Sequence, residues 1–150
     1  MTGAPDTLEM VVAADLAEVA RVLDAIEAFG AAHGVPAKVI FRLNLALDEL
    51  ITNIVDYGLA ERGGEGEIRL SVAAKNDVLD ALLSDNGTAF DPLTAPVREL
   101  PTSIEDSEVG GLGIRFVRSH IDRLDYRRDG EFNRLHLQID FNPADRPPPG

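Results

Sequence analysis

The sequence predicts one α+β domain of two layers, in which helices pack on one face of a mostly antiparallel, mixed sheet. Three features predict this class. Two N-terminal segments repeat apolar side chains every three or four positions, as amphipathic helices do. Later segments alternate apolar and polar residues, as half-buried strands do. The 150 residues, 45% of them hydrophobic, suffice for one core and leave no room for a second domain of useful size.

A strand and then a helix are predicted at the N-terminus. Thr7–Ala13 is rich in residues that favour β structure, and Asp15 is a predicted helix N-cap. The helix should end near Gly30–Gly34, because glycine favours helix ends. Its apolar face is predicted from four residues that lie three or four positions apart, Leu16, Val19, Leu23 and Ile26.

A second helix is predicted to open at Pro36, because proline suits the first helical turn, and to end at Gly58. Its apolar stripe is wide, which is typical of a helix buried against a sheet. The stripe consists of Ile40, Leu43, Leu47, Leu50, Ile51 and Ile54. The glycine-rich segment Arg62–Gly66 then predicts a turn.

Two strands are predicted next. The first is predicted from the alternation of Ile68, Leu70, Val72 and Ala74 with polar residues. After a turn at Lys75–Asp77, the nearly continuous apolar run Val78–Leu83 predicts a central strand. This strand leads directly into the polar turn Ser84–Gly87.

A loop and a third helix are predicted in the second half of the chain. Pro92–Glu108 shows no periodicity and is long enough to serve as a lid. Gly110–Gly113 then precedes a helix whose apolar side is predicted from Ile114, Val117 and Ile121.

A hairpin completes the predicted domain. Asp129-Gly130 is a strong turn signal between Leu124–Arg128 and Phe132–Ile139. Residues 1–143 are therefore predicted to form the folded domain, and the proline-rich residues 144–150 a flexible tail.

Composition narrows the function classes. With no cysteine, the chain has no disulfide and no thiolate metal site, which fits a cytoplasmic protein. The formal net charge of −12 disfavours nucleic acid as a partner, because phosphates would be repelled. Charged residues interrupt every long apolar stretch, and the N-terminus lacks the basic start and apolar core of a signal peptide. No membrane segment is expected.

Three short segments carry residues suited to nucleotide chemistry. In the first, Glu49 and Asn53 are four positions apart on the second predicted helix and therefore share a face. A carboxylate can act as a general base, and an amide oxygen can bind Mg²⁺. Taken alone, the same pair is also common on ordinary helix surfaces.

The second segment follows the predicted central strand. Asp85 is suited to accept a hydrogen bond from an exocyclic amine such as that of adenine, and Gly87 would let a flat ring approach the backbone. Phe90-Asp91-Pro92 follows closely. The alternative interpretation is a plain turn that ends the strand.

The third segment is Gly110-Gly111-Leu112-Gly113. Glycines before a helix let backbone N–H groups converge on an anion, and the helix dipole favours negative charge there. No Gly-Lys-Ser/Thr follows, as the Walker pattern requires, and no strand precedes, as the dinucleotide fingerprint requires. A flexible linker is the alternative interpretation.

In this order, the three segments resemble the motifs of the gyrase/histidine-kinase/chaperone/mismatch-repair (GHKL) ATPase superfamily. Glu49–Asn53 is similar to its asparagine box, Asp85–Gly87 with Phe90–Pro92 to its first glycine box, and Gly110–Gly113 to its second. The resemblance covers about Val39 to Asp125. The short chain and its Gly-Leu-Gly-Ile continuation look most like the anti-sigma-factor serine/threonine-protein kinases of bacterial partner-switching systems.

The resemblance implies a Bergerat ATP-binding fold, a histidine-kinase-like ATPase domain over residues 1–143, and ATP with Mg²⁺ as cofactors. It implies that Glu49 is the catalytic base and that Asn53 binds Mg²⁺ and the nucleotide. The other residues that it implies in nucleotide binding are Asp85, Gly87, Phe90, Gly110, Gly111, Leu112 and Gly113. The implied activity is phosphorylation of a STAS-domain anti-anti-sigma protein, with sequestration of a sigma factor and a homodimeric kinase.

Two alternatives share the predicted fold. A non-catalytic, nucleotide-dependent switch module is favoured by the acidic predicted lid, in which Arg98 is the cation and no residue that neutralises the γ-phosphate can be named. Tyr57 also stands where many relatives carry histidine. A histidine-kinase-type ATPase domain is the second alternative, and it is disfavoured because no helical segment with a phosphoacceptor histidine precedes the domain.

Overall fold

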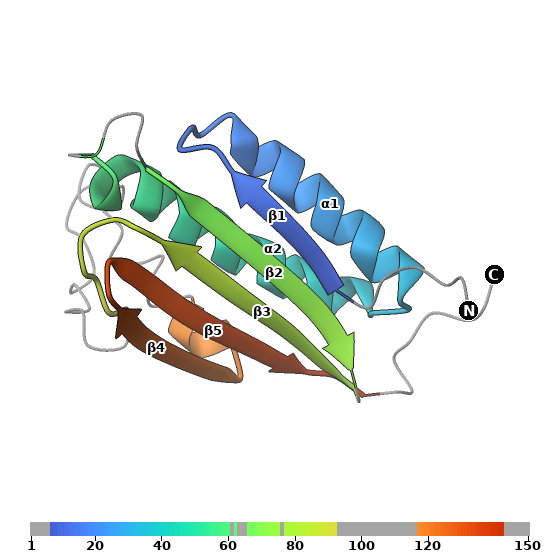
Figure 1. The fold of residues 1–150 in the computed structure, drawn as a ribbon. Helices are drawn as coiled ribbons and strands as arrows, with labels where there is room; N and C mark the ends of the chain where they lie inside the picture. Colours follow the sequence, from blue (N-terminus) through green and yellow to red (C-terminus); the bar gives the residue numbers. More distant parts are fainter. Residues whose placement is uncertain (1–6, 61, 63–65, 76, 93–116, 143–150) are drawn as a thin grey trace, which may run out of the picture.

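The computed structural model describes residues 7–60, 62, 66–75, 77–92 and 117–142 (Figure 1). Five strands form one sheet in the order β1-β2-β3-β5-β4, and each described pairing is antiparallel. The helices lie together behind this sheet (Figure 1), which confirms the predicted two-layer α+β class. The strands are β1 (Thr7–Val12), β2 (Ile68–Lys75), β3 (Val78–Asp85), β4 (Arg123–Asp129) and β5 (Phe132–Asp140).

Helix α1 (Glu18–Ala32) begins later than predicted. Asp15 is not its N-cap, because Ala17 takes that position, and the Asp15 carboxylate instead accepts a hydrogen bond from the Ala17 N–H (2.9 Å) in a turn before the helix. The later start changes the buried face. Leu16 is therefore exposed, and the core is contacted by Val22, Ile26 and Phe29.

Helix α2 (Ala37–Asn53) is capped by Pro36, as predicted. Its predicted stripe faces the core, with only Ile54 partly exposed. A π-helical turn, η1 (Ile54–Gly58), continues the helix, so the helical segment ends at Gly58 as the sequence indicates. Single π-helical turns occur often at functional sites.

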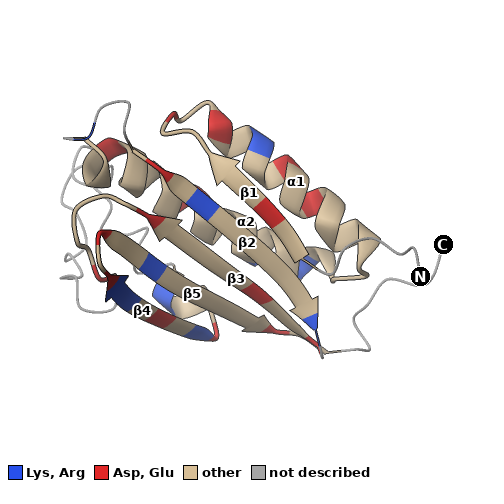
Figure 2. Ribbon diagram, viewed as in Figure 1, with Lys and Arg blue, Asp and Glu red and all other residues tan. Residues whose placement is uncertain are grey.

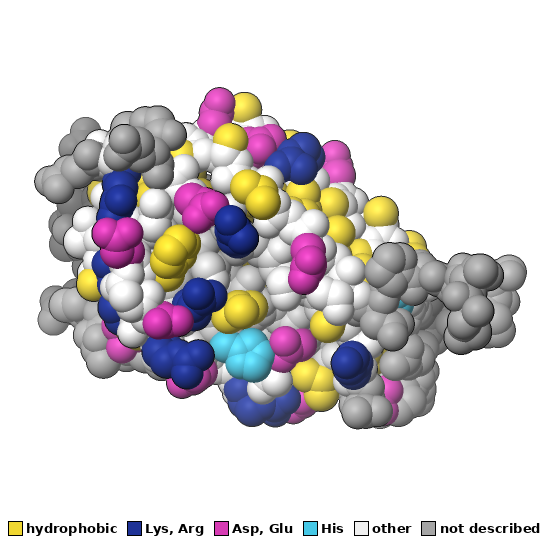
Figure 3. Space-filling view, viewed as in Figure 1, with side chains coloured by type: hydrophobic (Ala, Val, Ile, Leu, Met, Phe, Trp, Pro, Cys, Tyr) yellow, Lys and Arg dark blue, Asp and Glu magenta, His cyan; other side chains and the backbone are white. Residues whose placement is uncertain are grey.

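Strand β3 lies at the centre of the sheet, as predicted, but only one of its faces is covered. Leu79, Ala81 and Leu83 are buried beneath the helices, whereas Leu82 is partly exposed on the open face. The apolar run Val78–Leu83 is therefore buried on one face of the sheet only. The open face, seen in Figure 3, mixes acidic, basic and apolar side chains without a patch of one sign.

The β4–β5 hairpin forms where the sequence predicts it. Asp129 pairs with Phe132, so the two loop residues are Gly130 and Glu131, one position later than the Asp-Gly signal suggests. Gly130 has a φ of 60°, a conformation that favours glycine. Figure 2 shows that β4 is rich in basic residues, while acidic residues lie along α1.

The third predicted helix is described over residues 117–120, where Val117 is buried in the core; Ile121 is buried as well. The predicted lid Pro92–Glu108, apart from its first residue, and the loop Gly110–Gly113 lie outside the described residues, as does the tail 144–150. In the part of the chain that is described, no helix has the length and hydrophobicity needed to cross a membrane.

Candidate functional site

Glu49 and Asn53 contact each other on the last turns of α2. The Asn53 side-chain amide nitrogen donates a hydrogen bond to Glu49 Oε1 (3.1 Å), and both side chains are partly buried. Burial raises the pKa of the Glu49 carboxyl, and the negative charge of Asp48 raises it further, while the bond from Asn53 opposes both. A carboxylate with a raised pKa accepts protons more readily. The amide oxygen of Asn53 takes no part in the bond.

Asp85 ends β3 as a buried carboxylate that is 5% exposed. Its Oδ1 atom accepts hydrogen bonds from the Gly87 N–H (2.8 Å) and from the side-chain amide of Asn133 (3.0 Å). Burial raises the pKa of Asp85, and these two bonds and the nearby Arg128 guanidinium lower it. Within the described residues both bonds reach Oδ1, so the second oxygen, Oδ2, is the atom available to a further donor.

Gly87 packs against Gly58 at the end of η1. A Cβ atom on Gly87 would lie 2.5 Å from the Gly58 carbonyl oxygen, and the Thr88 N–H donates to that same oxygen (2.9 Å). This contact explains a glycine at position 87 by backbone packing alone. It also joins the helical segment that carries Glu49 and Asn53 to the turn that carries Asp85.

Asn133 and Tyr126 belong to the same cluster, although the sequence did not single them out. The Asn133 side chain also donates to the Thr88 carbonyl (2.9 Å), and it accepts bonds from the Tyr126 hydroxyl (2.5 Å) and the Phe90 N–H (3.3 Å). A signal was present in the sequence. Asn133 occupies an inward position of β5, where Leu135, Leu137 and Ile139 follow, and a polar residue in such a row calls for buried partners.

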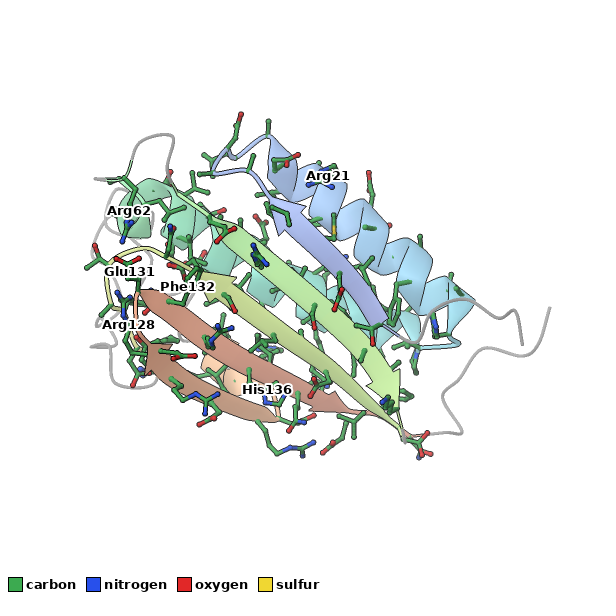
Figure 4. The ribbon with its side chains drawn as sticks, in the orientation of Figure 1. Arg21, Arg62, Arg128, Glu131, Phe132 and His136 are labelled. Atoms are coloured by element: carbon green, nitrogen blue, oxygen red, sulfur yellow. The ribbon has the colours of Figure 1, made fainter. Side chains whose placement is uncertain are left out.

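Arg128, on β4, holds the turn after β3 through hydrogen bonds. Its guanidinium donates to the Gly87 carbonyl (2.8 Å) and to the Gly130 carbonyl (3.1 Å). Figure 4 shows Arg128 with Glu131 and Phe132 around the β4–β5 turn, at the same end of the sheet as Arg62, which follows η1. The turn after β3 is thus tied to η1 on one side and to β4 on the other.

The remaining predicted residues divide into two groups. Phe90 is 47% exposed beside the turn, and Tyr57 is exposed on η1. Arg118 donates a hydrogen bond to the Pro92 carbonyl (2.8 Å). The loop residues Gly110, Gly111, Leu112 and Gly113 lie outside the described residues. Of the other two predicted segments, the first is joined to the second through the contact of η1 with Gly87.

Metal-ligand clusters do not occur in the described part of the chain, where no three His, Asp or Glu side chains converge. The amide oxygen of Asn53 is of the kind that Mg²⁺ accepts, because this ion takes oxygen ligands, keeps several waters and is commonly bound together with substrate phosphates.

Residues 12–139 match the family model of the histidine kinase-like ATPase domain. The match spans most of the 150 residues, so the chain belongs to this family. Membership of the GHKL-type ATPases, predicted from the three motifs, is thereby confirmed.

Among the relatives are bacterial protein kinases. The serine/threonine-protein kinase BtrW of Bordetella bronchiseptica is 32% identical over 137 residues, which cover 91% of this chain and 94% of BtrW. The serine-protein kinase RsbW of Listeria monocytogenes is 38% identical over 85 residues, and the match covers 53% of each chain. The prediction of an ATP-dependent protein kinase agrees with both names.

A solved structure has the same fold. The RsbU and RsbW domains of Rv1364c from Mycobacterium tuberculosis align with a TM-score of 0.66 at 16% identity. The alignment covers 91% of this chain and 32% of the other, so the chain spans about a third of that protein's structure.

Proposed function

We propose that this protein is an ATP-dependent serine/threonine-protein kinase of a bacterial partner-switching system. The observation that carries the proposal is the contact of η1 with the turn after β3, which joins the helical segment that carries Glu49 and Asn53 to the turn that carries Asp85. Membership of the ATPase family and the kinases among its relatives support it.

Asp85 is proposed to read the adenine base. Its Oδ1 atom is occupied by two donors, so Oδ2 is the acceptor that can meet the exocyclic amine of adenine. The Phe90 ring, exposed beside the turn, adds an apolar surface for the nucleotide. Gly87 contributes by keeping the turn close to η1.

Asn53 is proposed to hold Mg²⁺ through its amide oxygen, and Gly110, Gly111, Leu112 and Gly113 to surround the phosphates with backbone N–H groups. When bound, Mg²⁺ neutralises charge on the phosphates and stabilises the charge that develops during transfer. A chain with a net charge of −12 requires such local positive potential to hold a nucleotide that is itself strongly negative.

Glu49 is proposed as the general base. Its carboxylate accepts the proton of a serine or threonine hydroxyl on the partner, and the hydrogen bond from Asn53 holds it in orientation. The raised pKa of Glu49 makes it a stronger proton acceptor than an ordinary carboxylate.

The proposed partners are a STAS-domain anti-anti-sigma protein as phosphate acceptor, a sigma factor that the kinase sequesters, and a second copy of this chain in a homodimer. The support is the resemblance to anti-sigma-factor kinases, together with the RsbW names among the relatives and aligned structures. A cytoplasmic location goes with these partners.

The proposal is tested by incubating the protein with Mg-ATP and a STAS-domain protein encoded in the same gene cluster, and measuring the intact mass of the STAS protein. We expect one added phosphate, lost when ATP is omitted. Calorimetry on the kinase alone is the companion measurement. Binding of ATP without any phosphate transfer would favour the non-catalytic switch module, and phosphate on a histidine would favour the histidine-kinase-type domain.

A further inference from the structure

Asn133 has every hydrogen-bonding position of its side chain in use. The amide nitrogen donates to Asp85 Oδ1 and to the Thr88 carbonyl, and the amide oxygen accepts from the Tyr126 hydroxyl and the Phe90 N–H. The residue is 6% exposed. A buried amide with all partners present is held in one position, because any rotation would break several bonds in a poorly solvated environment.

The Phe90 N–H and the Asp85 carboxylate determine which way the Asn133 amide faces. If the amide were reversed, its N–H₂ group would face the Phe90 N–H, and two donors would meet. The oxygen would then face the carboxylate of Asp85. In the observed orientation the Tyr126 hydroxyl, on β4, donates to the amide oxygen of Asn133, on β5, and thereby supports the side chain that donates to Asp85, on β3.

We propose that Asn133 and Tyr126 are positioning residues that set the base selectivity of the nucleotide site. They fix the Asp85 carboxylate with Oδ1 occupied, so that Oδ2 is a rigid, acceptor-only group. Such a group accepts a bond from a 6-amino purine and repels the 6-carbonyl of hypoxanthine or guanine. This inference rests on the proposed function, because it assumes that Asp85 contacts the base.

The same strand supplies a matched control. On the open face of the sheet, the Gln138 amide nitrogen donates to Asp80 Oδ1 (2.8 Å), which also contacts His136 (2.5 Å). Figure 4 shows His136 on β5, away from the β4–β5 turn. Gln138 with Asp80 therefore repeats the pair formed by Asn133 with Asp85, an amide on β5 bonded to a carboxylate on β3, in a solvated place outside the site.

The test measures the affinities of ATP, inosine triphosphate and inorganic triphosphate, each with Mg²⁺, for the full chain by calorimetry. The variants are Asn133→Ala, Tyr126→Phe and the control Gln138→Ala, with folding checked by circular dichroism. We expect Asn133→Ala to reduce both the ATP affinity and the preference for ATP over inosine triphosphate about tenfold, and Tyr126→Phe to reduce the preference about threefold. Binding of inorganic triphosphate should stay unchanged, and Gln138→Ala should match the wild type throughout.

Each result bears on a different step. If the wild type does not bind ATP, the proposed function fails. Two results would leave the proposed function standing and overturn this inference. In the first, the wild type binds ATP but does not prefer it over inosine triphosphate. In the second, Tyr126→Phe and a folded Asn133→Ala both keep the wild-type preference within twofold. Parallel loss of inorganic triphosphate binding would also overturn it, because it would show a general structural role. Where Asn133→Ala does not fold, Tyr126→Phe decides, since it removes only one hydroxyl.

Discussion

Gly58 and Gly87 meet so closely that the backbone of η1 and the backbone of the turn after β3 leave no space for a methyl group at position 87. The contact is asymmetric. A Cβ atom on Gly87 would lie 2.5 Å from the Gly58 carbonyl oxygen, whereas a Cβ atom on Gly58 would have its nearest neighbours at 3.9 and 4.0 Å. One glycine is therefore required by packing, and the other is not.

Replacement of Gly87 by alanine should push η1 away from the turn, since the obstructing atoms belong to the backbone. We expect a loss of about 1–3 kcal/mol of unfolding free energy, the usual range for overpacking, together with loss of ATP binding. Gly58→Ala is the control and should be tolerated. Chemical denaturation and calorimetry of both variants measure the effect, and equal losses in the two would refute the asymmetric contact.

Asp85→Asn should raise the stability of the protein and weaken its recognition of ATP. Because burial raises the pKa of Asp85 in the folded state, its ionised form costs stability once the pH rises above the ordinary range of aspartate. The asparagine variant should melt at a higher temperature than wild type at pH 7.5, and the difference should shrink as the pH falls toward 4. An amide N–H₂ in place of Oδ2 should weaken ATP binding about a hundredfold and favour inosine triphosphate.

Thermal melts across that pH range, with titrations of both nucleotides, check this pair of outcomes. An Asp85→Asn protein that still prefers ATP would rule out base reading by Asp85.

The pH dependence of phosphate transfer should follow the ionisation of the Glu49 carboxyl. Transfer requires its ionised form, so the rate should fall as the pH falls through its pKa, and the raised pKa places this decline at higher pH than for an ordinary glutamate. Asp48→Asn removes a negative charge that raises the pKa. Rate profiles of this variant should keep the wild-type plateau and move the acid limb to lower pH; an unmoved limb would assign the titration to another group.

Asn53→Ala should distinguish a loss of metal binding from a loss of nucleotide binding. With the amide oxygen gone, the gain in ATP affinity that Mg²⁺ provides should fall about tenfold, while the affinity in the presence of a chelator should change little. Calorimetry with Mg²⁺ and with chelator measures both values. A uniform loss under both conditions would mean that Asn53 supports the site without binding the metal.

The sequence predicts most of this fold because its signals are local. The spacing along α2, the alternation in β2 and β5 and the glycine turn at Gly130 each depend on neighbouring residues. The predicted start of α1 is wrong because Asp15 has a local alternative: its carboxylate accepts a hydrogen bond from the Ala17 N–H in a turn instead of capping the helix.

The site was predictable only in part. Glu49, Asn53 and Asp85 stand in recognisable motifs, and the sequence names them. Asn133 and Tyr126 are separated from Asp85 by 48 and 41 residues along the chain, and only the antiparallel register of β3, β5 and β4 brings them together. The sequence also does not show why position 87 is a glycine, because the carbonyl oxygen that a side chain there would meet belongs to Gly58 on η1.

Single-turnover phosphate transfer to the STAS-domain partner tests whether Glu49 is the base of a protein kinase. Glu49→Gln is compared with Asp48→Asn, a matched carboxylate-to-amide change at the exposed neighbouring position. A general-base role for Glu49 predicts that Glu49→Gln binds ATP as the wild type does and transfers phosphate about 10²–10⁴-fold more slowly, while Asp48→Asn keeps the wild-type plateau rate. Transfer by Glu49→Gln at the wild-type rate would contradict it.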